Sequence, residues 1–182
     1  MNRRLWLILL FAATVLGCGH HTPWRVVTET APDPFVNQTL FAVAPLTCSG
    51  ALVNGTPWKD QSGPVEALDL NAGFAAGLMK VASDAGIRVV PATGPASAPF
   101  TVVPRLSLME RPEDPVLLGN LAKGKLEMHV GIAAPTGQVL DEIVLTTNIK
   151  VSAGLQVRYA AAAEDLGRLA GRYLARRVKP EP

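Results

Sequence analysis

The sequence has few of the side chains from which catalytic and metal sites are built. It contains two cysteines and three histidines, and aromatic residues make up 5% of the chain. His20 and His21 are adjacent, with no cysteine or carboxylate at the spacing of a tetrahedral metal site, which predicts solvated histidines. No set of residues combines a nucleophile, a base and a positioning group. We therefore expect a non-enzymatic protein without a metal or a cofactor.

The apolar run at the N-terminus is too short to span a membrane. It covers about twelve residues, 5–16, whereas a helix that crosses a bilayer needs roughly 20. Asn2, Arg3 and Arg4 precede it, and a positive segment ahead of a short apolar run is typical of a secretory signal peptide.

The end of this run, Val15-Leu16-Gly17-Cys18, resembles the lipobox of bacterial lipoprotein precursors. A small residue before the cysteine suits a peptidase pocket, and only a thiol can form the thioether to a lipid. The resemblance implies that signal peptidase recognises Val15, Leu16 and Gly17 and that Cys18 carries a diacylglyceryl group. Gly19, rather than aspartate, follows the cysteine, which implies sorting to the periplasmic face of the outer membrane. The alternative is an ordinary signal peptide with a cysteine at its junction.

Removal of residues 1–17 leaves a chain with balanced charge. The whole chain has 17 basic and 15 acidic residues, and the removed segment carries Arg3 and Arg4 but no acid. This balance predicts no electrostatic attraction to nucleic acid. With Cys18 lipidated, Cys48 has no partner for an intramolecular disulfide. We expect Cys48 to be a small buried apolar residue, the alternative being a reactive thiol or an intermolecular bridge.

The rest of the chain divides into a tether and one domain. Residues 18–38 contain three prolines and no periodic pattern, which predicts a lipidated, semi-extended tether. Such a tether, at roughly 3 Å per residue, would hold the domain several nanometres from the lipid. Residues 39–179 are long enough to form a single α+β domain with its own core.

Two segments have helical periodicity. In the first, from residue 65 or 69 to 85, apolar residues recur every three or four positions, and Gly86 supplies the stop. Gly73 and Gly77 cost about 1 kcal/mol each in a helix, which predicts close packing of this helix against the sheet. The second helix covers residues 158–178. Trp58, in a turn-rich segment, is predicted to cover the core as a lid, the alternative being a functional aromatic.

Alternation of apolar and polar residues predicts the sheet. Residues 39–45, 87–90 and 100–108 predict strands, the last with Pro104 at an edge or a bulge. Residues 126–134 and 143–151 flank a Pro/Gly turn and predict an antiparallel hairpin. Its expected register places Val130 opposite Ile143 and Met128 opposite Leu145. The fold we expect is α+β: an antiparallel sheet of about four to five strands with two helices on one face, in the order β-α-β-β-β-β-α.

Three polar residues of the hairpin are candidates for chemistry. His129 lies on the outward face near Glu127, where acid–base work is one interpretation and a solvated sheet histidine is the favoured one. Asp141 and Glu142 are adjacent in sequence, so their side chains are expected on opposite faces of the strand. A proton or metal shared between those two carboxylates is therefore not expected.

Two other sets of residues are candidates for contact with a partner. Arg168, Arg172 and Arg176 follow Glu164 at helical spacing, which predicts either a basic stripe for lipid headgroups or a partner, or a solvated face with a Glu164–Arg168 pair. A second set lies between two strands and is either tucked under the sheet or exposed for contact. These residues are Val116, Leu117, Leu118 and Leu121.

The order of elements, with the run from Met128-His129-Val130 to Thr136-Gly137-Gln138-Val139-Leu140, resembles a group of small envelope lipoproteins. They include the lipopolysaccharide-assembly lipoprotein that plugs the outer-membrane translocon, the curli-secretion lipoproteins and the lipoprotein activators of peptidoglycan synthases. The resemblance implies a non-catalytic accessory or scaffold in envelope assembly or secretion that binds an outer-membrane or periplasmic protein. The alternative is a periplasmic lipoprotein that binds a lipid or small molecule between helices and sheet.

Overall fold

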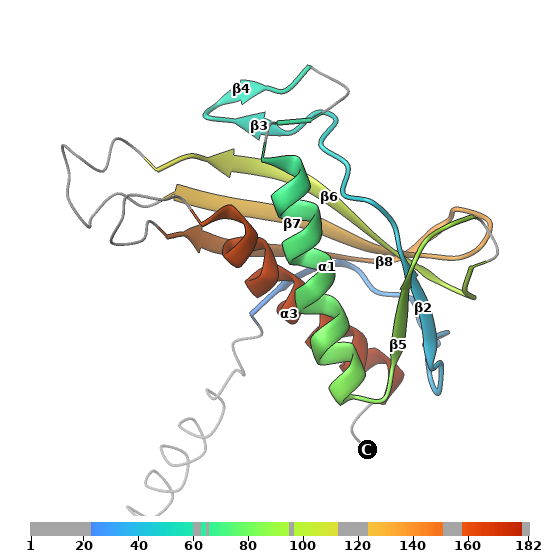
Figure 1. Ribbon diagram of the computed structural model, residues 1–182. Helices are drawn as coiled ribbons and strands as arrows, with labels where there is room; N and C mark the ends of the chain where they lie inside the picture. The colour runs from blue at the N-terminus through green and yellow to red at the C-terminus, as the bar shows by residue number, and fades with distance from the viewer. Residues whose placement is uncertain are drawn as a thin grey trace, which may run out of the picture.

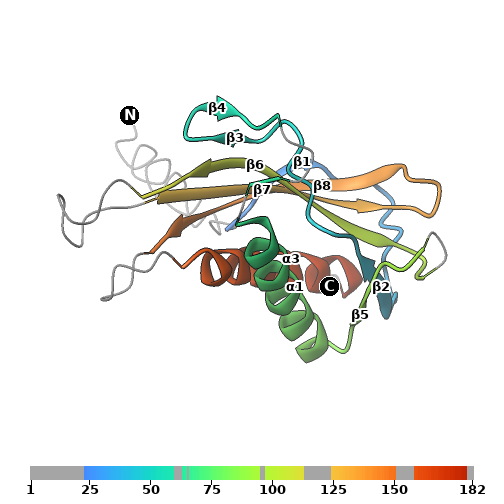
Figure 2. The same ribbon diagram turned by 45° about the horizontal axis from the view of Figure 1, so that its top comes forward.

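The computed structural model describes residues 23–59, 63, 64, 66–94, 97–112, 124–150 and 158–179. In this part of the chain eight strands form one mixed sheet, and two helices cover one of its faces (Figure 1 and Figure 2). The strands are β1 (Arg25–Thr28), β2 (Leu40–Val43), β3 (Leu52–Val53), β4 (Thr56–Pro57), β5 (Arg88–Pro91), β6 (Thr101–Glu110), β7 (Gly124–Ala133) and β8 (Val139–Ile149). The helices are α1 (Ala67–Asp84) and α3 (Tyr159–Val178).

The centre of the sheet is the antiparallel meander β6-β7-β8. Met128 pairs with Leu145 and Val130 pairs with Ile143, which confirms the predicted register of the hairpin. All four side chains are buried beneath the helices. A slip of one residue would turn this apolar row to the outer face, and this is why alternation determined the register.

The predicted sheet of about four to five antiparallel strands is wrong. The strand order is β1-β8-β7-β6-β2-β5, with the β3–β4 hairpin beside β6, and β2 runs parallel to both β5 and β6. Helix α1 carries the chain back to the end of the sheet where β2 began, so β5 must run in the same direction as β2. Strands β3 and β4 have two residues each, too few for an alternating pattern.

Strand β6 uses its second edge twice. Its start pairs with β2 and its end pairs with β3, and Pro104 lies between the two stretches, where its missing N–H breaks no ladder bond. Pro104 itself pairs in regular register with Val130, and the bulge against β7 lies farther along, between Leu106 and Leu108. The shift buries Met109 completely, whereas Leu108 is half-buried.

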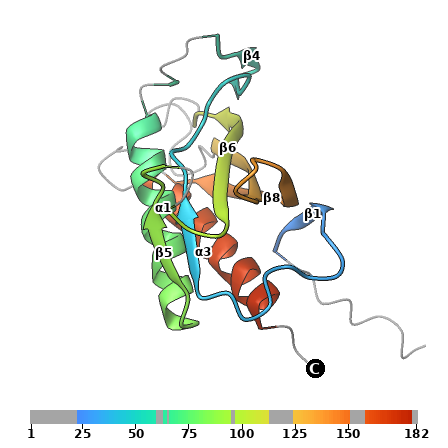
Figure 3. The same cartoon turned by 90° about the vertical axis from the view of Figure 1, so that its right-hand side faces the viewer.

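Part of the segment expected to be a tether is folded into the domain. Strand β1 pairs with β8 along the edge of the sheet, and Figure 3 shows it at the side of the sheet away from β5. Phe35 is completely buried, with its ring 5.0 Å from that of Phe100 and 6.3 Å from that of Phe41. Prolines interrupt any periodic pattern in this segment, which is why its sequence resembled a linker.

The helices pack on each other through glycine. A Cβ atom at Gly73 or Gly77 would fall inside 3 Å of a backbone carbonyl of α3, and one at Gly167 would fall inside 3 Å of the carbonyl of Phe74. The close approach expected for Gly73 and Gly77 is therefore to α3 rather than to the sheet. No helix in the described ranges combines the length and apolar character needed to cross a membrane.

Candidate interaction site

A buried ion cluster joins the N-terminal segment to α3 and β8. Asp141 of β8 is fully buried, and Arg177 of α3 is 7% exposed. Arg177 Nε donates to Asp141 Oδ2 at 2.7 Å, while the Tyr173 hydroxyl donates to the same oxygen at 2.7 Å. Thr30 completes the cluster, because its N–H donates to Asp141 Oδ1 at 2.8 Å and its carbonyl accepts from Arg177 Nη2 at 2.8 Å.

Two more carboxylates of the N-terminal segment reach the same arginine. Asp33 Oδ2 lies 2.8 Å and Glu29 Oε1 lies 3.2 Å from Arg177 Nη1. Burial lowers the pKa of Arg177, but the hydrogen bond and charge of Asp141 outweigh it, so the net shift is upward. Burial raises the pKa of the Tyr173 hydroxyl, and its hydrogen bond to the Asp141 carboxylate raises it further. Asp141 and Arg177 are buried, and their hydrogen bonds are made to other residues of the chain. This arrangement suits a structural clamp that joins the N-terminal segment to α3 and β8.

The position of Asp141 follows from β-strand parity. Asp141 shares the core-facing row of Ile143, whereas Glu142 faces the opposite side, as the sequence predicted. Tyr173 and Arg177 are one helical turn apart, so both can reach a single carboxylate. Sequence analysis missed the cluster, although an acid on the apolar row of a strand is the signal that marks it.

A shallow groove lies on the open face of the sheet. His129 Nδ1 is 2.6 Å from Glu142 Oε1, and Arg105 Nη2 is 3.6 Å from the same oxygen. Thr47, Val103 and other residues complete a depression of about 280 Å³. His129 therefore pairs with Glu142 of the neighbouring strand, while Glu127 accepts from the Ser107 hydroxyl at 3.0 Å. The groove can bind polar groups through Arg105, His129 and Glu142.

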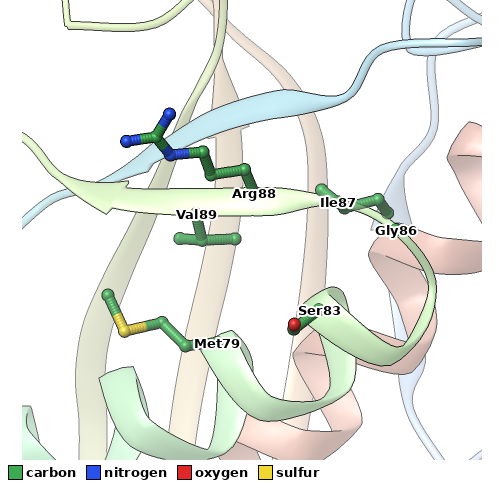
Figure 4. A pocket seen from close by; sticks show the side chains of 6 residues that line it. All are labelled: Met79, Ser83, Gly86, Ile87, Arg88 and Val89. Carbon is green, nitrogen blue, oxygen red and sulfur yellow. The ribbon is translucent and has the colours of Figure 1, made fainter.

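A second depression lies between α1 and β5. Figure 4 shows Met79 of α1 and Val89 of β5 directed toward each other, while Arg88 points away from the helix. Its volume is about 350 Å³, and a smaller depression of about 150 Å³ continues past Met79 toward Pro45 and Pro91. These surfaces can hold an apolar side chain.

The three predicted arginines have different environments. Arg168 pairs with Glu164 one turn earlier, as in the solvated-face interpretation. Arg176 Nη2 lies 2.6 Å from Glu29 Oε2, whereas Arg172 is exposed. Other predicted site residues lie outside the described ranges: His20, His21, Val15, Leu16, Gly17, Cys18, Val116, Leu117, Leu118 and Leu121.

The strand end that precedes residues 113–123 is held by an ion pair. Arg111 donates from Nε and Nη2 to the two oxygens of Glu66, at 2.8 and 3.0 Å, and its backbone N–H donates to Asn54 Oδ1 at 2.8 Å. Burial alone would raise the pKa of Glu66, but the hydrogen bonds and charge of Arg111 outweigh it and lower the pKa. The end of β6 is thereby fixed to the start of α1 and to the β3–β4 hairpin.

The remaining buried side chains behave as core residues. Cys48 is 6% exposed, and burial raises the pKa of its thiol, in agreement with the predicted apolar role. Trp58 packs against the core from outside, as expected of a lid.

A sheet covered on one face by two helices is a fold of binding and assembly domains as well as of enzymes, so the fold alone does not identify a function. No protein-family model and no curated protein matches the sequence. The PelC dodecamer from Paraburkholderia phytofirmans shares the fold, with a TM-score of 0.52, 12% identity, and coverage of 86% of this chain and 97% of that one. Protein XCC0632 from Xanthomonas campestris aligns with a TM-score of 0.43 and 15% identity over 82% of this chain and 87% of that one. At these identities the PelC comparison establishes the fold alone.

Proposed function

We propose that the protein is a lipid-anchored lipoprotein on the periplasmic face of the outer membrane, acting as a non-catalytic scaffold or accessory in envelope assembly or secretion. The observation that carries the proposal is the lipobox-like Val15-Leu16-Gly17-Cys18 after a short apolar run. The fold is consistent with a non-catalytic role, because the buried ionic groups around Arg177 pair with one another and join segments of the chain. This pairing supports a domain that works through its surface.

The likeness to PelC supports an assembly role. That protein is a dodecamer, so the same fold is compatible with association of many copies. In this chain the contact residues we propose are Val116, Leu117, Leu118 and Leu121. Residues 113–123 connect the adjacent ends of β6 and β7, where Glu110 pairs with Lys125. Exposed apolar residues commonly mark contact sites for other proteins.

Binding of a lipid or small molecule is the second candidate, and the depression between α1 and β5 is the observation in its favour. Its volume of about 350 Å³ is near the lower limit of ligand pockets, roughly 300 Å³. A small apolar group fits such a space, whereas a whole glycolipid does not. We therefore rank this function below the scaffold.

Two measurements test the proposal. The mass of the membrane-extracted protein should correspond to a chain that begins at Cys18 with three acyl chains or a diacylglyceryl group, and Cys18→Ser should remain unprocessed. An unmodified Cys18 in the mature protein would remove the basis for anchoring.

Co-purification from detergent-solubilised membranes tests the scaffold role. We expect an envelope protein at constant stoichiometry, lost in Leu117→Asp/Leu118→Asp. The matched control is Leu68→Asp, because Leu68 of α1 is 82% exposed. Recovery of a lipid without a protein would favour the second candidate instead.

A further inference from the structure

The structure shortens the distance between the proposed lipid and the folded domain. Trp24 is already packed on α3, so only five residues separate it from Cys18. Six peptide steps span at most about 20 Å. A tether of residues 18–38 would have allowed a distance of several nanometres between the lipid and the domain. If Cys18 is lipidated, Trp24 therefore lies within about 20 Å of the membrane surface.

We propose that the edge of the domain formed by Trp24, β1 and the C-terminal half of α3 docks on the phospholipid headgroups of the membrane that holds the anchor. This inference rests on the proposed lipidation and adds an orientation to it. The open polar face and the β5 edge then point elsewhere and are available to partners.

Trp24 cannot easily be pulled away to lengthen the connection. Its ring meets that of Tyr173 edge to face, with centroids 5.7 Å apart, and the Arg176 guanidinium lies 5.8 Å from its centroid. Arg176 is itself paired with Glu29, and the buried cluster around Arg177 holds the chain beyond β1. All of these contacts would have to break before the connection between Cys18 and the folded domain could become longer.

The chemistry of this edge suits the headgroup region. Val26 and Val27 are 42% and 47% exposed, and Arg25 is exposed beside them. Arg172 lies one turn before Arg176 on α3, so it projects from the flank that carries Trp24. Tryptophan and arginine with exposed apolar side chains are the residues that proteins place at the membrane interface. Guanidinium groups donate hydrogen bonds to lipid phosphates.

A membrane is a better occupant of this edge than a second copy of the chain. Strand β1 has four residues, and its register shifts between Val26 and Thr28. Short strands with such irregularities pair poorly with further strands. The acidic group at the edge, Glu29, is neutralised by Arg176 and Arg177, so it does not repel phosphate.

Fluorescence quenching of the lipidated full-length protein tests the orientation. Once residues 1–17 are removed, Trp24 and Trp58 are the two tryptophans left in the chain. The variant Trp58→Phe is reconstituted in vesicles of phosphatidylethanolamine and phosphatidylglycerol brominated near the top of the acyl chains. We expect Trp24 to lose about half its emission, since interfacial groups lie within about 5–10 Å of this depth. Trp24→Phe reports on Trp58, which follows β4 at the other side of β6 and should not be quenched.

Charge reversal gives a matched pair of variants. Arg172→Glu in the Trp58→Phe background should reduce quenching of Trp24, whereas Arg88→Glu, an equal charge change at the β5 edge, should not. The orientation is overturned if lipidated protein shows no quenching of Trp24, or quenching of Trp58 instead, and the proposed anchor would then still stand. A mass spectrum without lipid on Cys18 would defeat both.

Discussion

Asp141 and Glu142 show how one position along a strand changes the role of a carboxylate. Asp141 is fully buried with Arg177, while the side chain of Glu142 is 27% exposed beside His129. We expect Asp141→Asn to lower the free energy of unfolding by about 3 kcal/mol, because it removes the buried charge that accepts hydrogen bonds from Arg177 Nε and from the Tyr173 hydroxyl. The measurement is urea-induced unfolding at neutral pH.

The neighbouring carboxylate provides the control. Glu142→Gln removes a charge from a solvent-accessible pair and should cost less than about 1 kcal/mol. Equal losses for the two substitutions would contradict the assignment of Asp141 as the clamp. A double variant, Asp141→Leu/Arg177→Met, should lose less than the sum of its single changes, since neither Asp141 nor Arg177 is then left in the core without the other.

Cys48 should be unreactive in the folded protein. It is 6% exposed, and burial raises the pKa of its thiol, so the thiolate that reacts with electrophiles is scarce. We expect iodoacetamide to modify Cys48 at neutral pH only when denaturant unfolds the chain, as followed by mass spectrometry. Rapid modification of the native protein would restore the alternative of a reactive thiol.

At the scale of elements, the close contact between α1 and α3 depends on glycines, which have no side chain to keep the two backbones apart. Gly77→Ala places a Cβ inside 3 Å of the Glu164 carbonyl, which forces two helix backbones apart. We expect a net loss of about 2 kcal/mol in unfolding free energy, because overpacking outweighs the gain of about 1 kcal/mol in helix propensity. Gly94→Ala is the control, since a Cβ at Gly94 meets nothing within 4 Å. A stabilised Gly77→Ala variant would show that the helices are not in backbone contact.

The pair Glu66–Arg111 should make stability depend on pH. Because the pKa of Glu66 is lower in the folded state, its contribution is complete above its ordinary value of 4.5 and is lost as the pH falls through the folded pKa. The stability difference between wild type and Glu66→Gln should therefore shrink from neutral pH to about pH 3. Arg111→Met should reproduce this trend. A difference independent of pH would contradict the assignment.

Alternation along the chain predicted the residue pairs at the centre of the β7–β8 hairpin, because one wet face and one apolar face limit the register to a small set. It did not predict the strand ends, since β8 begins at Val139 rather than at residue 143. It could not predict which strand lies beside β6, since β2 and β3 share that edge and Pro104 marks only a gap in the ladder. Simple alternation ends after Leu106 in β6, where the bulge inserts a residue. Strand β1 carries no pattern of its own and is ordered by pairing with β8.

At the scale of the whole molecule, the candidate site was predictable only in part. The arginine row was found from helical spacing, but spacing cannot show that Glu29, far away in the sequence, neutralises Arg176. The clamp around Arg177 needs three segments to meet, and no local pattern describes such a meeting. Trp24 and Glu29, near the start of the described residues, pack on α3. The N-terminal end of the domain therefore has a defined position. That end is also where the proposed lipid attaches.

Truncation tests whether the N-terminal segment belongs to the domain or to the tether. A chain that starts at Pro23 should unfold at the same urea concentration as one that starts at Gly19. A chain that starts at Ala31 lacks Trp24, β1 and Glu29, and it leaves Arg177 without the Thr30 carbonyl. We expect it to lose about 3 kcal/mol, from hydrogen bonds to charged groups at roughly 1.5–3 kcal/mol each, and to aggregate through the exposed edge of β8. Equal stability of the three chains would mean that β1 is a removable strap, and the short connection to the membrane would then no longer follow.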